Sequence, residues 1–406
     1  MRVETQRPMS TSDLRIRIVG KIADIPAKAW DACANPAERN SQDTSYNPFI
    51  SYAFLSALEA SSSVTARSGW QPQHLVAETN DGTILGVAPC YLKSHSRGEY
   101  VFDRGWAEAY ERAGGDYYPK LQVSVPFTPA TGRRLLAAPG ARHDEVEAGL
   151  AQGLVELCRR REASSVHVTF MTEPEWRALG ERGFLQRTDQ QFHWENAGYA
   201  TFDDFLGALA ARKRKTVKRE RREALSNGIE VQWLTGSDLT EAVWDDFFAF
   251  YMDTGSRKWG RPYLTREFFS LIGRKMADRI LLVMAKRAGR YIAGAINFVG
   301  SETVFGRHWG AIEHHPFLHF ELCYYQAIDF AIAKKLARVE AGAQGEHKLA
   351  RGYLPVTTYS AHYIADPALR RAIADYLVRE RAYIEAAGRE LGAMAPFRRD
   401  LAAEDV

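Results

Sequence analysis

RILLVMAKRAGRYIAGAINFVGSETVFGRHWG, residues 279–310, indicates most clearly how this chain folds. Two apolar runs flank Ala288-Gly289-Arg290 and a third follows Gly300-Ser301, a pattern that predicts a β-hairpin extended by one more strand. An earlier stretch, QHLVAETNDGTILGVAPCYL at 73–92, has the same form around Asn80-Asp81-Gly82. We therefore expect a hairpin in each half of the chain.

The segments after the two hairpins also correspond. In the first half an amphipathic helix over 144–161 leads into a strand over 165–170, and in the second half a helix over 317–336 leads into a strand over 338–342. Any α/β protein alternates in this way, but the similar lengths of the halves favour duplication. The sequence therefore predicts two α/β units with mixed sheets.

The units are expected to divide near Gly198. We predict a disordered lead-in over 1–26, a first domain over 27–197, a second over 198–366 and a C-terminal helix and tail over 367–406. One long helix, ending at Asn227-Gly228, is expected to open the second domain. Asp366 and Pro367 suit the first positions of a helix over 367–391, and the tail after Met394 looks loose.

Composition bounds the class of protein. With 406 residues, 46% of them hydrophobic, and a net charge of +3, the chain is neither disordered nor a polyelectrolyte. No apolar run approaches the roughly 20 residues of a membrane span, so we expect a cytoplasmic protein. Its four cysteines lack the spacing of a structural zinc site, and Cys90 and Cys323 lie in apolar runs that predict buried thiols.

The most unusual segment for chemistry is EAGAQGEHKLARGYLP, residues 340–355. It follows a predicted strand, and α/β proteins place their sites at the carboxyl ends of strands. Glu346 or His347 could act as a general base toward an amine. Lys348 and Arg351 could hold a carboxylate or a phosphate. The alternative is a solvated loop with surface ion pairs.

A second cluster surrounds the end of the long hairpin stretch. Three histidines in six residues (His314, His315 and His319) invite a metal site, but they have neither helical i,i+4 spacing nor an HExxH pattern. Tyr324 and Tyr325 are adjacent on the following helix and cannot share a face, so one of them belongs to the core. The cluster therefore predicts substrate contacts rather than a metal centre.

The basic run RKRKTVKRERRE, residues 212–223, holds eight basic and two acidic side chains. It could be a solvated helix face, a groove for the phosphates of a nucleotide, sugar phosphate or tRNA, or a non-specific nucleic-acid contact. No helix-turn-helix or zinc pattern accompanies it, so we expect no DNA partner. In the first half, the loop over 131–134 could bring backbone N–H groups and arginines to phosphate oxygens.

Three stretches resemble a known family. GRHWGA (306–311), LHFELCYYQAIDFAIAKKL (318–336) and EAGAQGEHKLARGYLPVTTYSAHYI (340–364) look like the signature of predicted bacterial N-acyltransferases. That family is labelled as peptidoglycan biosynthesis or recognition proteins and is related to the FemAB transferases of the GNAT superfamily. With NPFISYAFLSALE (47–59), the resemblance spans about 27–379. It implies an α/β fold of two tandem GNAT-like domains with mixed sheets, followed by a C-terminal helix.

The resemblance also implies an activity and leaves its donor open. FemAB transferases move an aminoacyl group from tRNA to an amine of a peptidoglycan precursor, whereas ordinary GNAT enzymes use acyl-CoA, held by a Q/R-x-x-G-x-G/A turn. The segment 130–133 approximates that turn only loosely. We therefore keep both acyl-CoA and aminoacyl-tRNA as donors. The rival hypothesis is a non-catalytic GNAT pair that binds a peptidoglycan fragment or a nucleotide-linked ligand.

These interpretations give a set of candidate residues for an N-acyltransferase that needs no metal. The expected bases are Glu346 and His347. The expected substrate-binding residues are His308, Trp309, Glu321, Tyr324, Gln344, Lys348, Arg351, Arg212 and Lys215. The expected contacts to the donor phosphates are Gly132, Arg133 and Arg134.

Overall fold

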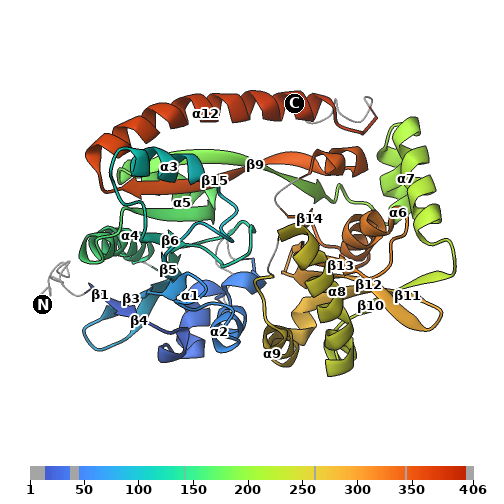
Figure 1. Cartoon of the computed structure of the whole chain (residues 1–406), viewed down its shortest axis with the longest axis horizontal. Helices are drawn as coiled ribbons and strands as arrows, with labels where there is room; N and C mark the ends of the chain where they lie inside the picture. The colour runs from blue at the N-terminus through green and yellow to red at the C-terminus, as the bar shows by residue number, and fades with distance from the viewer. Residues whose placement is uncertain (1–13, 37–44, 141, 260–261, 343–344, 399–406) are drawn as a thin grey trace, which may run out of the picture.

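The computed structural model describes residues 14–36, 45–140, 142–259, 262–342 and 345–398. Two α/β halves lie side by side, and a long C-terminal helix crosses both of them along one edge (Figure 1). No helix within these ranges is long and apolar enough to cross a membrane. The disordered lead-in predicted over 1–26 is wrong for its described part, because Leu14–Val19 forms a strand that pairs with His74–Thr79; residues 1–13 lie outside the described ranges.

The first half contains a small sheet and several covering helices. The small sheet has the strand order β1-β3-β4-β7. Its strands are β1 (Leu14–Val19), β3 (His74–Thr79), β4 (Ile84–Ala88) and β7 (Leu136–Ala137). The helices of this half are α1 (Ala27–Ala34), α2 (Tyr52–Ala60), α3 (Arg104–Arg112), α4 (His143–Arg160) and α5 (Glu173–Glu181). The predicted first hairpin is confirmed as β3 paired antiparallel with β4.

A second sheet of eleven strands runs through both halves in the order β10-β11-β12-β13-β14-β9-β15-β8-β6-β5-β2. The strands from the first half are β2 (Trp70–Pro72), β5 (Cys90–Lys93), β6 (Lys120–Val123), β8 (Ser165–Met171) and β9 (Leu185–Glu195). Those from the second half are β10 (Ile229–Leu234), β11 (Ile280–Arg287), β12 (Arg290–Val299), β13 (Thr303–Ala311), β14 (Arg338–Glu340) and β15 (Leu354–Ile364). The predicted second hairpin with its third strand is thus confirmed as β11, β12 and β13.

The two halves exchange strands. β15, the last strand of the chain, pairs antiparallel with β8 and β9 of the first half. The end of β9 pairs in turn with β14 of the second half, so that His193 faces Glu340. Each half therefore completes the sheet of the other. The predicted domain limits near Gly198 stay a prediction, because this exchange leaves neither half closed on itself.

The helices of the second half position its strands. They are α8 (Glu241–Trp259), α9 (Arg266–Met276), α10 (Leu318–Phe320), α11 (Gln326–Ala333), and the short helices η6 (Glu321–Tyr325) and η7 (Glu346–Arg351). η6 is one turn of π-helix between α10 and α11. Such a turn inserts one residue and re-aims the side chains around it.

Two predicted details at the surface are wrong. The long helix after Gly198 is two helices, α6 (Phe202–Ala208) and α7 (Ala211–Ala224). The break occurs because Leu209 forms a β-bridge with Phe397, and the Ala210 N–H donates to the Pro396 carbonyl. The same contacts hold the segment after Met394, which looked loose in the sequence, as far as it is described.

The C-terminal helix α12 (Pro367–Ala393) is confirmed, and Asp366 caps it by accepting from the Leu369 N–H. It covers β9 and β15, the two exchanged strands (Figure 1). One hydrophobic core also joins the halves, since the Phe49 ring lies 5.1 Å from the rings of Phe298 and Phe305. Because apolar burial drives packing, this shared core fixes one half against the other.

Candidate active site

The central cavity opens where two strands separate. β13 and β14 run parallel and pair only between Thr303–Phe305 and Arg338–Glu340. β13 continues to Ala311, whereas β14 ends at Glu340. Beyond that point lies a cavity of about 840 Å³ whose lining comes from both halves.

The wall on the side of the second half contains several predicted residues. His308, Trp309, Tyr324 and His347 line this cavity, together with Arg307 and Cys323, which the sequence did not single out for chemistry. The Cys323 side chain is half-buried in the wall rather than in the core, and this corrects its expected place. Four of the predicted residues therefore lie around one space, whereas their roles there stay a prediction.

A β-bulge shapes this wall. Asn297 on β12 pairs with Gly306, but the next residue, Ile296, pairs with His308, so Arg307 has no partner on β12. A bulge leaves the extra residue outside the ladder and redirects the strand. The backbone of Arg307 is therefore outside the ladder, next to the space where a ligand would enter between β13 and β14.

Tyr324 and His347 form a hydrogen-bonded pair in the cavity wall. The Tyr324 hydroxyl lies 2.9 Å from His347 Nε2. Burial lowers the pKa of His347, and Arg351 and Lys348 lower it further, so its imidazole is neutral at pH 7. Tyr325 turns away and donates to Glu220 in the core, which confirms that only one of the two tyrosines reaches the site.

The other candidates of the segment 344–351 have different surroundings. Gln344 lies outside the described residues, and for Glu346 only the backbone in η7 is described. Lys348 is buried, donates to the Gly342 carbonyl at 2.8 Å, and has its pKa lowered to about 8 by burial. It holds the loop after β14 and does not line the cavity.

Arg351 and Glu321 are both committed to ion pairs within the protein. Arg351 donates to both carboxylate oxygens of Glu220, at 2.8 and 3.1 Å, and its guanidinium lies over the Phe320 ring. Glu321 is fully buried and accepts from Arg221. Their predicted contacts with substrate are corrected accordingly, because these charges already have partners inside the fold.

The loop over 131–134 is also structural. It lies between β6 and β7. Arg134 is fully buried and donates to four backbone carbonyls, while Arg133 donates to those of Cys33, Ala34 and Ala137. At Gly132, an added Cβ would lie 2.5 Å from the Asn47 amide. The predicted donor-phosphate site at Gly132, Arg133 and Arg134 is therefore corrected to a folded loop.

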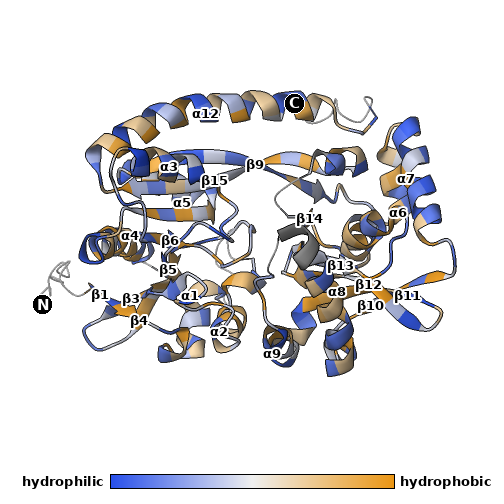
Figure 2. Cartoon of the chain, viewed as in Figure 1, coloured by the Kyte–Doolittle hydropathy of each residue, from blue (hydrophilic) through white to orange (hydrophobic). Residues whose placement is uncertain are grey.

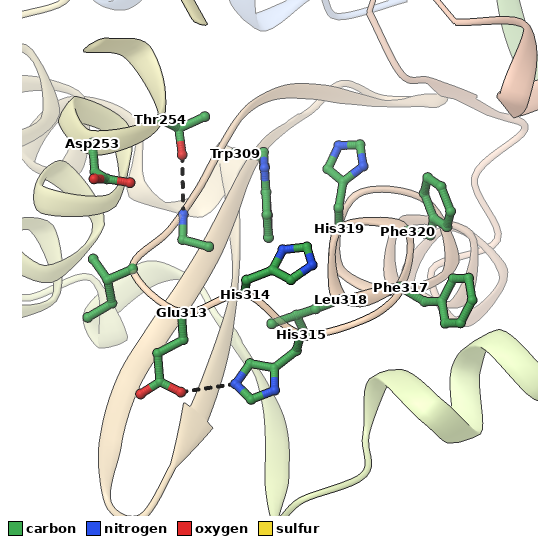
Figure 3. Close-up of a pocket in the computed structure, with 12 residues that line it drawn as sticks. Asp253, Thr254, Trp309, Glu313, His314, His315, Phe317, Leu318, His319 and Phe320 are labelled. Atoms are coloured by element: carbon green, nitrogen blue, oxygen red, sulfur yellow. Dashed lines mark hydrogen bonds and ion pairs between the residues drawn. The ribbon is translucent and has the colours of Figure 1, made fainter. Parts of the chain in front are cut away.

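An outer pocket of about 620 Å³ adjoins the cavity at the start of α10. Thr254, Trp309 and His319 line both spaces. Figure 3 shows His314, His315 and His319 around the loop between the strand and the helix, with His315 bonded to Glu313 at 2.9 Å. Within the described ranges, no group of three or more potential ligand side chains could hold a metal ion.

The basic helix α7 lies beside this outer pocket. Arg212 and Lys215 are exposed on it, and the helix is strongly hydrophilic (Figure 2). The Arg219 guanidinium lies 5.9 Å from the centre of the Phe317 ring, which lines the pocket. The described structure therefore brings a positive surface to the pocket entrance, although Arg221 is withdrawn into its ion pairs.

Comparison with solved structures defines the class of fold. FemX is 11% identical, with 86% of this chain and 98% of FemX covered and a TM-score of 0.52. The C-terminal domain of a protein named as a lysylphosphatidylglycerol synthetase, from Agrobacterium fabrum, is 8% identical, with 88% and 97% covered and a TM-score of 0.53. A tandem GNAT protein of clavulanic acid biosynthesis is 12% identical, with 87% and 99% covered and a TM-score of 0.48.

The protein thus has the α/β fold of FemX, with mixed sheets and the C-terminal helix that the sequence predicted. It belongs to the FemAB-like family of peptidoglycan biosynthesis and recognition proteins, whose sequence pattern it matches over residues 21–399. No curated protein is detectably similar to it in sequence. The family's description covers both the biosynthesis and the recognition of peptidoglycan.

Proposed function

We propose that this protein transfers an acyl or aminoacyl group from an activated ester or thioester to an amine in the central cavity. The observation that carries the proposal is that the bulged residue Arg307 and the Tyr324–His347 pair line the same cavity, next to the point where β13 and β14 separate. The bulge at Arg307 offers backbone for a carbonyl group, and His347 offers a neutral imidazole. Acyl transfer to an amine requires both.

The reaction needs no covalent intermediate on the protein. The amine nitrogen attacks the carbonyl carbon of the donor, a C–N bond forms, and the bond from that carbon to oxygen or sulfur breaks. His347 takes one proton from the nitrogen and passes it to the leaving oxygen or sulfur, which departs with the bonding electrons. Holding both reactants in one cavity makes the attack effectively intramolecular.

His347 is the base in this proposal. In the tautomer that carries its hydrogen on Nε2, the ring donates to Tyr324 and leaves Nδ1 to accept the proton. His308 also lines the cavity, but burial lowers its pKa to about 3, which makes it a weak base. Glu346 stays a prediction, because its side chain is not described.

We favour aminoacyl-tRNA as the donor. The support is α7, on which Arg212 and Lys215 are exposed and whose Arg219 lies over Phe317, a residue of the outer pocket. A basic helix can follow the phosphates of a nucleic acid, and such binding weakens steeply with salt. Arg212→Gln/Lys215→Gln should weaken tRNA binding and flatten its salt dependence. Equal binding of both forms at all salt concentrations would point to acyl-CoA instead.

The acceptor in this proposal is an amine of a peptidoglycan precursor. The family's association with peptidoglycan supports this choice, and the cavity between the halves is large enough for a branched peptide. Because aminoacyl-tRNA and such precursors meet in the cytoplasm, we place the reaction there. Lys348 acts on substrate through the loop after β14, whose Gly342 carbonyl it holds, and a contact of Gln344 with substrate stays a prediction.

The test is transfer of a radiolabelled amino acid from bulk aminoacyl-tRNA, or of a labelled acyl group from acyl-CoA, to a muropeptide amine. Wild-type protein should form an amide, and His347→Gln should bind both substrates normally while transfer slows by roughly 10²–10⁴-fold. Binding of both substrates by the wild type without any transfer would identify a non-catalytic binding protein. Equal transfer by His347→Gln would remove His347 from the chemistry.

A further inference from the structure

Asn297, in the wall of the central cavity, carries a buried hydrogen-bond acceptor without a partner. It lies on β12 and is buried, yet it is one of the residues that line the cavity. Its Nδ2 donates to the carbonyls of Leu281 at 3.3 Å and Ala295 at 3.4 Å, whereas its Oδ1 has no hydrogen-bond partner. Buried polar atoms are nearly always paired, so an unpaired one beside a cavity indicates a partner that arrives with the ligand.

The orientation of this amide is fixed. Because both backbone carbonyls accept from Nδ2, a flipped amide would set Oδ1 against two other oxygens. Asn297 therefore offers the cavity an acceptor and not a donor. A group that satisfies it must carry N–H or O–H, which the donor carbonyl lacks and an amine supplies.

Gly306 keeps the space beside that oxygen open. It faces Asn297 across the β12–β13 ladder, where the bulge begins. A Cβ at this position would lie 3.4 Å from Asn297 Oδ1 and 3.5 Å from the Glu340 carbonyl oxygen. The φ angle of Gly306 is not positive, so the backbone does not require glycine here. What the missing side chain provides is room at the point where β13 and β14 separate.

We propose that Asn297 Oδ1 accepts a hydrogen bond from the attacking amine and that Asn297 and Gly306 position the acceptor. This inference rests on the proposed function. The amine nitrogen gives one N–H to Asn297, surrenders one proton to His347, and directs its lone pair at the donor carbonyl beside Arg307. A primary amine has hydrogens for both partners. A secondary amine or an alcohol has only one, so the site should select primary amines.

The test compares a primary amine acceptor with its N-methyl derivative for four variants. Asn297→Leu removes the acceptor oxygen at similar volume. Gly306→Ala adds a methyl group that fits at ordinary contact distance but occupies the space beside Oδ1. Gln122→Met is the control for the amide, since Gln122 is also buried with an unpaired Oε1 but is not among the residues lining the cavity. Gly207→Ala, with nothing near its added Cβ, is the control for glycine.

Asn297→Leu and Gly306→Ala should lower kcat/KM for the primary amine by roughly ten- to a hundredfold, because a lost hydrogen bond in the transition state has that size. The ratio of kcat/KM for the primary amine to that for the N-methyl amine should fall as well. Hydrolysis of the donor by water, donor affinity and thermal stability should match those of the two controls. If the wild type transfers but these variants keep its rate and its preference for primary amines, the inference is overturned. If the wild type transfers to no amine, the proposed function itself fails.

Discussion

Replacing Arg351 by methionine removes one partner of a buried ion pair. The two side chains of the Arg351–Glu220 pair are 8% and 5% exposed. Removing one member of such a pair costs about 3–5 kcal/mol, because the other charge remains buried without its counter-ion. Glu220 keeps its hydrogen bond from Tyr325, so we expect the lower end, about 3 kcal/mol.

Urea unfolding followed by tryptophan fluorescence measures this loss. At a slope of about 3 kcal/mol per molar urea, the midpoint should fall by about 1 M. Adding Glu220→Gln should recover part of the stability, since no carboxylate then remains unpaired. Arg389→Met is the matched control: its pair with Glu385 is 67% and 73% exposed, and its loss should shift the midpoint little. Unchanged stability of Arg351→Met together with lost substrate binding would refute this reasoning and return Arg351 to the substrate.

Two further predictions concern pH. Burial lowers the pKa of His193 and of His308 to about 3. As the pH falls, these histidines therefore take up protons in the unfolded chain before they do so in the folded protein. Their neutral forms contribute fully to stability above pH 6.5, and this contribution is lost as the pH falls toward 3. At pH 5.5 each histidine should lower the free energy of unfolding by about 1.4 kcal/mol. Unfolding at several pH values measures this loss, and the free energy of unfolding should depend less steeply on pH in His308→Asn. The transfer rate should fall only below pH 6.5, because the lowered pKa keeps His347 neutral above it, and a plateau that extends unchanged to pH 4 would exclude His347 as the base.

Local patterns in the sequence were enough to predict much of the fold. The hairpin turns at Asn80-Asp81-Gly82 and Ala288-Gly289-Arg290, the helix after each hairpin, and the cap at Asp366 are encoded by neighbouring residues, and all are observed. The exchange of β15 into the first half is not encoded in this way. Its pairing with β8 joins residues nearly 200 positions apart, and no periodicity within either strand specifies that partner.

The candidate site was predicted only in part, because local sequence patterns do not show which distant residues meet. His308, Trp309, Tyr324 and His347 come from one contiguous half and do line the cavity. Arg351 and Arg134 were misread because a buried arginine and an exposed one look alike in sequence, and their partners lie far away or on the backbone. Asn297 was missed because an asparagine inside a strand shows its unused oxygen only once its neighbours are placed.

The cavity as the site of transfer can be tested most directly through Cys323. It is half-buried in the cavity wall, whereas Cys33, Cys90 and Cys158 are fully buried, so N-ethylmaleimide should modify Cys323 first. We predict that modification, confirmed by mass spectrometry, abolishes amide formation, that the donor protects the thiol, and that Cys323→Ser is active and resistant to the reagent. Full transfer activity in protein carrying the adduct on Cys323 would contradict the placement of the reaction in this cavity.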